Sequence, residues 1–519
     1  MADYTWDRAG ADNDWENVNN WGGVAYPGDG DDALFDNAAL EMPDTNLPTT
    51  GTIGFVFTAD ITVTLSDLVN GATIGDVTVN SNGAYIINDG SAGTINIADG
   101  VVEQSATGTV SFVVSGAGAE LYISGTTTIT GTITDGGAGG NVYADPDGPT
   151  SLSTTFTTGT IVLNLDGGSE WVGDVIGNVT CFDDTTGTRE ITGDLTLSAT
   201  GTLDTSVDAE TFFVDGNLVA TNGSTIIGNA GGTVEVSGNY SRAGPTGTVT
   251  NLHLRMTGTG TAHSIYSSDY PLSFTVASTA VTTLDANMSV KKLVVEAGGE
   301  MTGAGALHIS YPSVDFIDIA GTVSNDIAVQ QQYSRNNSGD IITSGRFTYR
   351  ATLARSTTMV QSGVLSAGST LVLSGNYDNE IATLICTGAS VVAGDVTLGF
   401  ASGTDRAGAL DVSGVSGAVT IGDLVDAAGG SSALVLGAKD ITLDGDWDGT
   451  DIAVTASGTV TGDDTMTLSN MGDPGAVVKV YGGVVDDGSN HENWVFSSDD
   501  VQSDNEKGGA LRRSLQGAA

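Results

Sequence analysis

Short alternating runs of Thr, Val and Ile, separated by glycine, make up most of the chain. The segments "TGTITDGG" and "GTVTGDDTMTLSN" are typical. β-branched residues favour strands, and few helix-forming residues accompany them. Glycine, Asp and Asn at the breaks are the residues that tight turns require. The pattern therefore predicts an all-β protein built of short strands.

The turn residues recur at a nearly constant interval. A glycine followed by Asp or Asn and then by an apolar residue returns after 20, 23 and 22 residues in one series, and after 19, 28 and 23 residues in another. The first series consists of Gly173, Gly193, Gly216 and Gly238, and the second of Gly375, Gly394, Gly422 and Gly445. Longer phrases also repeat, since "VSGNYSR" begins at Val236 and "LSGNYDN" begins at Leu373. An internal period of this length indicates a repeat architecture.

A period near 22 residues fits one coil of a right-handed parallel β-helix, a β-solenoid. Each coil would hold two or three short strands and would stack on the next at about 4.8 Å. Tandem β-sandwich domains, with hairpins every 8 to 12 residues or so, would also be rich in Gly, Asn and Thr, with turn signals at roughly that spacing. The period and the repeated phrases favour the β-solenoid.

Aromatic residues gather at both ends of the chain. Trp6, Trp15 and Trp21 are half of the six tryptophans, and Phe35 follows them. The segment from Val477 to Phe496 breaks the repeat and holds Tyr481, Trp494 and Phe496. A solenoid ends on unpaired strand edges and an open apolar core, so its terminal repeats act as caps. We therefore expect aromatic caps at both ends.

These patterns divide the chain into six regions. We expect an N-terminal cap or attachment segment at 1–50, β-solenoid at 51–240, an irregular solenoid or inserted module at 241–372, β-solenoid at 373–470, a C-terminal cap at 471–500 and a flexible tail at 501–519.

The charge of the chain is strongly negative. Its 519 residues include 63 acidic and 16 basic residues, for a formal charge of -47. Nucleic acids and anionic membrane surfaces attract clusters of basic residues, so neither is expected as a partner. Disordered chains are poor in apolar residues, whereas 39% of this chain is hydrophobic. The start "MADYTWD" lacks the basic and apolar regions of a secretory signal, so we expect no such export, and no apolar run is long enough for a membrane helix.

The few basic residues are unevenly placed. Half of them lie between 240 and 360, and three more lie in the last 13 residues. The same middle region holds His253, His263 and His308, and Tyr240, Tyr266, Tyr270, Tyr311, Tyr333 and Tyr349. Contacts with an acidic neighbouring subunit are expected at Arg335, Arg346, Arg350, Arg355, Arg512 and Arg513. The alternative is a set of irregular coils with a more polar face.

One segment suggests a metal. Residues 28 to 34, "GDGDDAL", resemble a single copy of the calcium-binding nonapeptide repeat, with Asp29, Asp31 and Asp32 as ligands. That family binds calcium between tandem copies, so the alternative is an acidic turn. Cys181 and Cys386 lie 205 residues apart and are expected to be buried and unbridged.

The sequence predicts no catalytic residue and no cofactor other than this calcium. It has no Gly-x-Ser-x-Gly elbow, no HExxH and no phosphate loop, and its four histidines lack metal-ligand spacing. Carboxylate pairs of the kind that glycosidases use are unavoidable among 63 acidic residues and therefore carry no information.

The two ends carry a family resemblance. The pattern W-x8-W-x5-W-x5-P-x7-F, from Trp6 to Phe35, resembles the start of large bacterial surface solenoids and of some bacteriophage virion proteins. The phrase D-D-G-S-N-x-x-N-W-x-F, from Asp486 to Phe496, is similar to the endings of phage structural proteins built on β-solenoids.

The resemblance implies a non-enzymatic structural component of a virus particle: a head decoration, a fibre or a tailspike shaft. It would form a rigid β-helical rod, assemble as a homotrimer and contact the major capsid or tail protein, or host-surface polysaccharide. It would be made in the host cytoplasm. The alternatives are a secreted bacterial surface adhesin or S-layer-like protein, and a tailspike polysaccharide depolymerase.

Overall fold

The computed structural model consists almost entirely of β-strands and turns. It describes residues 2–37, 40 and 46, and strand segments alone between 52 and 181. Beyond these it describes residues 187–206, 210–244, 246–264, 271–312, 315–352, 356–375, 380–399, 406–427, 432–450, 452–462, 465–482, 484–486 and 493–496. The one helix among the described residues is η1 (Val18–Trp21), a single 3-10 turn.

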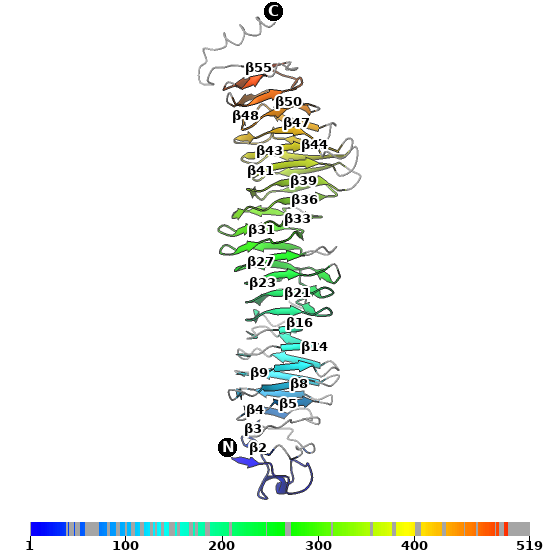
Figure 1. Ribbon diagram of the computed structural model, residues 1–519, viewed down its shortest axis with the longest axis vertical. Coiled ribbons are helices and arrows are strands. Elements are labelled where there is room, and N and C mark those ends of the chain that lie inside the picture. The colour runs from blue at the N-terminus through cyan, green and yellow to red at the C-terminus, as the bar shows by residue number, and fades with distance from the viewer. Residues whose placement is uncertain are drawn as a thin grey trace, which may run out of the picture. The chain divides into compact units, whose positions relative to one another are not determined.

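The chain forms two compact units. Unit 1 contains Met1–Gly260 and Ile265–Pro271, and unit 2 contains Thr261–Ser264 and Leu272–Ala519. Strand β27 (Thr259–Ser264) is divided between them. Figure 1 shows the strands of each unit stacked one coil upon another.

Unit 1 begins with a single ladder of paired strands and then widens into several. The first ladder joins β1 (Asp3–Thr5), β2 (Asp32–Phe35), β3 (Thr52–Phe57) and β4 (Ala72–Val79). From β4 one ladder continues through β6 (Thr94–Ala98), β9 (Ala119–Ser124), β12 (Gly140–Ala144) and β14 (Phe156–Leu165). Another continues through β7 (Val101–Gln104), β10 (Thr128–Ile129) and β13 (Ser151–Leu152). A third joins β5 (Ala84–Asp89), β8 (Thr109–Val114) and β11 (Thr132–Asp135) to β14.

The later coils of unit 1 have three sides. One side stacks β15 (Glu170–Trp171), β17 (Arg189–Ile191), β20 (Thr211–Val214), β23 (Thr233–Val236) and β26 (His253–Met256). Strand β16 (Val175–Cys181) follows β14 and starts the other two sides. The second side stacks β18 (Leu195–Leu197), β21 (Leu218–Ala220) and β24 (Tyr240–Arg242). The third side stacks β19 (Thr202–Asp204), β22 (Thr225–Ile227) and β25 (Thr248–Thr250).

Unit 2 repeats this plan. One side of its first coils stacks β28 (Ser273–Val276), β31 (Leu293–Val295) and β34 (Ile317–Ile319). A second side stacks β29 (Val281–Thr283), β32 (Glu300–Thr302) and β35 (Thr322–Val323). The longest ladder joins β30 (Met288–Val290), β33 (Leu307–Ser310), β36 (Ile327–Gln331), β39 (Phe347–Ala351), β41 (Leu365–Ser374), β43 (Val391–Leu398), β45 (Val419–Ile421), β48 (Asp440–Leu443), β51 (Thr459–Thr461), β53 (Val478–Tyr481) and β55 (Trp494–Phe496).

Two further ladders complete unit 2. One ladder starts at β38 (Ile341–Thr343), which pairs with β41, and β41 in turn pairs with β43. From β43 this ladder continues through β46 (Leu424–Asp426), β49 (Trp447–Asp448), β52 (Thr467–Ser469) and β54 (Val485–Asp486). The other ladder joins β37 (Arg335–Asn337), β40 (Thr357–Gln361), β42 (Glu380–Cys386), β44 (Arg406–Asp411), β47 (Ser432–Gly437) and β50 (Ile452–Ala456). The described residues between 272 and 372 thus form parallel coils of the same type as those before and after them in the sequence.

All of these strand pairs are parallel, and they follow the sequence period. Leu195 pairs with Leu218 and Leu218 with Tyr240, one coil apart in each case. Leu203 pairs with Ile226 in the same way. The predicted all-β class and parallel β-solenoid are therefore confirmed. The alternative of β-sandwich domains with antiparallel hairpins is wrong for the described strands, because the hydrogen-bonded neighbour of each is in the next coil.

The core lies inside the coils, because alternate residues of each strand point inward. Leu195 and Leu197 in β18 are fully buried, and Thr196 between them is half-buried. Cys181 and Cys386 are buried and are not joined by a disulfide, as the sequence predicts. Burial raises the pKa of the Cys386 thiol to about 12, so this side chain serves as a small apolar group.

The inward and outward positions of β21 give a direct test of the stacked core. We expect Leu218→Asp to lower the free energy of unfolding by more than about 4 kcal/mol, because a carboxylate would be buried without a partner. Val219→Asp, at the neighbouring outward and half-buried position, is the matched control and should lower it by about 1 kcal/mol, the span of strand propensity. Urea unfolding followed by circular dichroism measures both. Equal effects of the two substitutions would contradict a stacked core at this level.

Candidate functional site

Successive turns of unit 1 are joined through the side chains of Asp and Asn. The backbone N–H of Asn217 donates to Asp194 Oδ1 at 2.7 Å, and that of Asn239 donates to Asn217 Oδ1 at 2.8 Å. Asn217 Nδ2 also donates to Asp194 Oδ1 at 2.9 Å. The residue after each Asp or Asn starts the next strand, at β18, β21 and β24. We call this series of bonds the turn ladder.

The glycine of each turn lies against the turn of the preceding coil. A Cβ on Gly216 would lie 2.5 Å from Gly193 O, and one on Gly238 would lie 2.5 Å from Gly216 O. Such distances are far below van der Waals contact, so a side chain at either position would push the coils apart. The recurrence of Gly-Asp and Gly-Asn in the sequence therefore has a physical cause. Glycine permits the close approach, and the Asp or Asn side chain accepts the hydrogen bond.

Unit 2 has its own turn ladder. The backbone N–H of Asp446 donates to Asp423 Oδ1 at 2.7 Å, and that of Thr467 donates to Asp446 Oδ1 at 2.6 Å. The buried indole of Trp447 donates from Nε1 to Gly422 O at 2.9 Å. The Trp447 side chain thus packs in the core and also donates a hydrogen bond to a backbone carbonyl in the turn of the preceding coil.

The N-terminal aromatic residues form one buried cluster. The ring centroid of Trp21 lies 4.9 Å from that of Trp6, 4.7 Å from that of Trp15 and 6.1 Å from that of Phe35, each pair edge to face. All four side chains are at most 3% exposed. The indole nitrogens of Trp15 and Trp21 donate to Pro27 O and Trp15 O. This cluster closes the start of unit 1, where β1 pairs with β2.

The aspartates beside this cluster bond to the chain itself. Asp31 accepts hydrogen bonds from the backbone N–H of Ala2 and of Gly28, and these bonds lower its pKa. Among the described residues, no group of three or more His, Cys, Asp or Glu side chains is arranged to hold a metal ion. The calcium site suggested at Asp29, Asp31 and Asp32 stays a prediction, with an acidic turn as its alternative.

The C-terminal aromatic residues lie on the last two strands of the longest ladder. In β55, Trp494 pairs with Val478 and Phe496 pairs with Val480. Trp494 is 6% exposed and donates from Nε1 to Gly472 O at 2.9 Å, whereas Tyr481 and Phe496 are half-buried. Trp494 is thus the one of the three that closes the core at this level.

The three described arginines among those expected to make contacts do not all lie at one site. Arg346 and Arg350 line one cavity and Arg335 lines another. Arg355, Arg512 and Arg513 lie outside the described residues. Two other arginines are buried in unit 1: Arg189 donates from Nε to Leu165 O at 3.0 Å, and Arg242 donates from Nη2 to Gly247 O at 2.8 Å.

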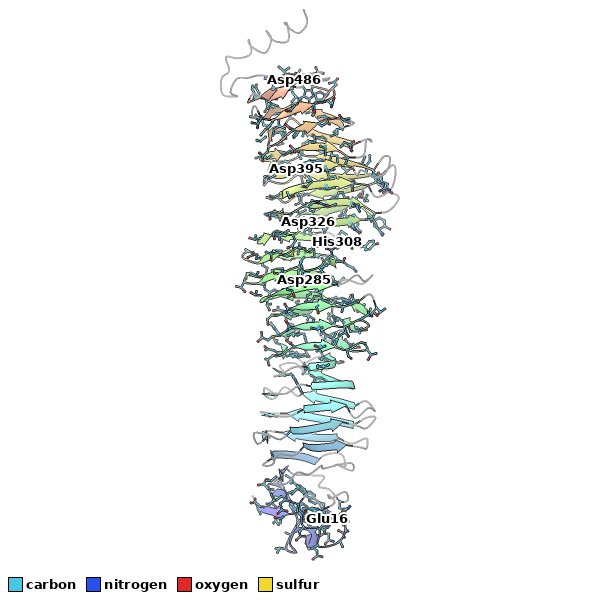
Figure 2. All side chains as sticks on the ribbon, viewed as in Figure 1. Glu16, Asp285, His308, Asp326, Asp395 and Asp486 are labelled. Atoms are coloured by element: carbon cyan, nitrogen blue, oxygen red, sulfur yellow. The ribbon has the colours of Figure 1, made fainter. Side chains whose placement is uncertain are left out.

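The first cavity, the outer groove, crosses strands β33, β36 and β39 and has a volume of about 200 Å³. It is lined by Ala306, His308, Asp326, Ile327, Ala328, Val329, Gln330, Arg346, Thr348 and Arg350. Figure 2 labels His308 and Asp326 at this level. Asp326 Oδ1 accepts the backbone N–H of Arg346 at 2.9 Å. Burial and the charge of Arg350 lower the pKa of His308, so its imidazole is neutral at neutral pH.

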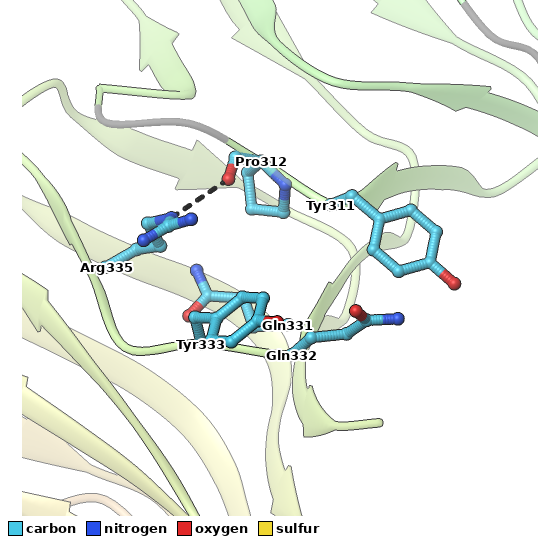
Figure 3. Close-up of a pocket in the computed structure, with 6 residues that line it drawn as sticks. All are labelled: Tyr311, Pro312, Gln331, Gln332, Tyr333 and Arg335. Carbon is cyan, nitrogen blue, oxygen red and sulfur yellow. Dashed lines mark hydrogen bonds between the residues drawn. The ribbon is translucent and has the colours of Figure 1, made fainter. Parts of the chain in front are cut away.

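The second cavity lies where the same coils turn, and we call it the tyrosine pocket. It has a volume of about 120 Å³ and is lined by Tyr311, Pro312, Gln331, Gln332, Tyr333 and Arg335. Arg335 donates from Nε to Pro312 O at 3.2 Å, and its guanidinium carbon lies 5.7 Å from the ring centroid of Tyr333. In Figure 3, Arg335, Gln331 and Tyr333 lie on one side of the pocket, and Tyr311 and Gln332 lie on the other.

Comparison with known proteins does not identify a family for this chain. No family model, curated protein or solved structure matches the chain. No helix in the described part of the chain is long and apolar enough to cross a membrane.

Sequence reasoning did not single out the glutamines of the tyrosine pocket or the amides inside unit 2. Asn337 is fully buried and its Nδ2 donates to Gln361 Oε1 at 2.9 Å, one coil later. Asn337 Oδ1 accepts the backbone N–H of Ile317, one coil earlier, at 2.9 Å. An Asn or Gln at an inward position, about one period from another, is the signal that could have revealed this internal ladder.

The glycine requirement of the turn ladder can be tested at Gly216. We expect Gly216→Ala to lower the free energy of unfolding by about 1–3 kcal/mol, because the new Cβ would collide with Gly193 O. Gly472→Ala is the matched control, since a Cβ there meets nothing within 4 Å, and it should be neutral to within about 0.5 kcal/mol. Chemical unfolding of the two variants measures the difference, and equal stability would contradict the close approach of the turns.

The hydrogen bonds of the turn ladder can be tested at Asn217. Asn217→Ala removes the acceptor of the Asn239 N–H and should cost about 1–3 kcal/mol of unfolding free energy. Asn217→Ser keeps an acceptor oxygen without adding a charge beside Asp194 Oδ1 and should recover part of that loss. If alanine and serine are equally harmful, the bond to the side chain does not hold the coils together. The measurement is again the shift of the unfolding midpoint.

The N-terminal cluster depends most on Trp21, which contacts the other three rings. We expect Trp21→Ala to cost about 3–5 kcal/mol and to make unit 1 bind a hydrophobic dye. Tyr26→Ala, at a side chain that is 39% exposed, should do neither. Dye fluorescence and light scattering on heating report the opening of this end, and an unchanged Trp21→Ala protein would argue against a closing role for the cluster.

Proposed function

We propose that the chain is a non-enzymatic structural component of a virus particle: a head decoration, a fibre or a tailspike shaft. The observation that carries the proposal is the turn ladder, which joins coil to coil alongside the strand pairing in each unit. Sliding one coil over the next would break many parallel hydrogen bonds together, so such a stack is mechanically stiff. The assignment to a virus draws on the resemblance of the two ends to phage solenoid proteins.

The chemistry of the two cavities supports a non-enzymatic role. Glycosidases commonly use two carboxyl groups held about 5 to 10 Å apart. Among the described residues, the outer groove has one carboxylate, Asp326, which accepts a backbone hydrogen bond, and the lining of the tyrosine pocket has none. Neither cavity therefore offers the pair that cleavage of a polysaccharide commonly requires.

The proposed partners are further copies of the chain, in a homotrimer, and the major capsid or tail protein. Arg346 and Arg350 in the outer groove are suited to an acidic neighbour, because guanidinium groups bind carboxylates at interfaces. The protein would be made in the host cytoplasm and act in the virion.

Locating the protein tests this proposal. Antibodies raised against the purified chain should label virus particles under the electron microscope, and the chain should sediment with particles from a lysed culture. Analytical ultracentrifugation should give the mass of three 52.3 kDa chains. Labelling of the outer surface of uninfected cells, with no label on particles, would instead support a secreted adhesin and overturn the proposal.

A further inference from the structure

The tyrosine pocket has features that the stacking of coils does not need. Tyr311 and Tyr333 are 54% and 53% exposed, in a chain whose aromatic side chains are mostly buried where the structure describes them. Tyr311 also has a φ of 53°, in the left-handed region that an aromatic residue rarely adopts. A strained backbone that exposes a large ring is a recognised indication of a functional site.

A buried donor points into the same pocket. Gln331 is 1% exposed, and its Oε1 lies 3.2 Å from the hydroxyl of Tyr349. Its Nε2 has no hydrogen-bond partner among the described residues. Burying an N–H group without an acceptor is unfavourable, and Gln331 lines the cavity. A ligand oxygen in the pocket would supply the missing acceptor.

Arg335 adds a positive charge to the pocket. Arg335 uses Nε and Nη1 to donate to Pro312 O and Ser334 O, which leaves Nη2 without a partner in the described part of the chain. The chain holds 63 acidic residues, but none of the described residues that line the pocket is acidic. The pocket therefore offers donors and a positive charge, and it suits a ligand rich in acceptors.

We propose that the tyrosine pocket binds one carboxylated sugar unit of an acidic polysaccharide. Gln331 Nε2 and Arg335 Nη2 donate to the carboxylate and ring oxygens, since guanidinium groups match carboxylate geometry. The exposed rings of Tyr311 and Tyr333 pack on the apolar face of the sugar. A volume of about 120 Å³ suits one sugar unit rather than a long chain.

This inference goes beyond the proposed structural role and does not depend on it, because the same pocket would bind sugar in a virion component or in a secreted surface protein. Localisation decides the first proposal and sugar binding decides the second.

The experiment is saturation-transfer NMR on the full chain with paired probes. Trigalacturonate and sialyllactose carry a carboxylate, whereas methyl-esterified trigalacturonate and lactose are their uncharged counterparts. Measurements at about 0.15 M salt limit repulsion from the acidic surface, because the screening length there is about 8 Å. We expect at least one acidic probe to bind at millimolar concentration, about tenfold more tightly than its uncharged counterpart.

Matched variants locate the binding. Tyr333→Ala and Arg335→Gln should each weaken it about tenfold or more, whereas the controls Tyr26→Ala and Lys479→Gln, both at exposed side chains, should leave it unchanged. Tyr311→Asn should also weaken binding but keep or raise the melting temperature, because Asn tolerates a positive φ. This last variant separates binding from folding even if Arg335→Gln is unstable.

Four outcomes would overturn the proposal. They are no binding of either acidic probe at 10 mM (roughly the weakest affinity worth assigning), equal binding of the uncharged counterparts, and binding that all three pocket variants retain. The fourth is a loss of oligomer mass in Arg335→Gln, which would show that the pocket holds an acidic side chain of a second copy of this chain.

Discussion

The hydrogen bond from one turn to the Asp or Asn side chain of the preceding turn is the constraint on which each unit depends. It forms only when neighbouring turns are close, and a Cβ on Gly216 would lie 2.5 Å from Gly193 O. A slip of one residue would break this bond and also turn Leu218 from the core to the surface. Turn chemistry and core packing thus specify the same register, and agreement between the two levels is what selects a single fold.

The parts of the fold that could be predicted from the sequence are those that repeat in residue type. Gly-Asp and Gly-Asn recur because the turn ladder uses them at Gly193, Gly216 and Gly238 and at Gly422 and Gly445. The aromatic residues at the ends stand out because few other residues of the chain are aromatic. The buried Arg189 and Arg242 could not be recognised. They occupy inward positions of ordinary strands, and their acceptors, Leu165 O and Gly247 O, are backbone groups that no sequence pattern marks. The tyrosine pocket could not be predicted for the same reason. Its key donor, Gln331, differs from other glutamines only in its surroundings in the folded chain, which no sequence pattern marks.

The negative charge has to be reconciled with stacking, because like residues lie above one another in successive coils. In unit 1, Asp194 is followed in the turn ladder by Asn217 and then by Asn239. An amide oxygen accepts the same hydrogen bond as a carboxylate without repelling the charge one coil away. In unit 2, Asp423 is followed by Asp446, and two charges about 5 Å apart in water repel each other by roughly 1 kcal/mol. A hydrogen bond from the backbone stabilises the fold by a similar free energy. The ladder can therefore accommodate such a pair of aspartates, but the pair adds little net stability.

A regular solenoid coil satisfies its own polar groups and therefore leaves little for a ligand. The Asn337 side chain shows this, because Ile317 N, Gly339 O and Gln361 Oε1 occupy its hydrogen-bonding groups. Gln331 is an inward amide too, yet one end of it has no partner among the described residues. It lies beside Tyr311, where the backbone departs from ordinary geometry. Binding in this architecture should therefore arise where the repeat is broken, while the unbroken coils provide the stiffness that holds such a site in place.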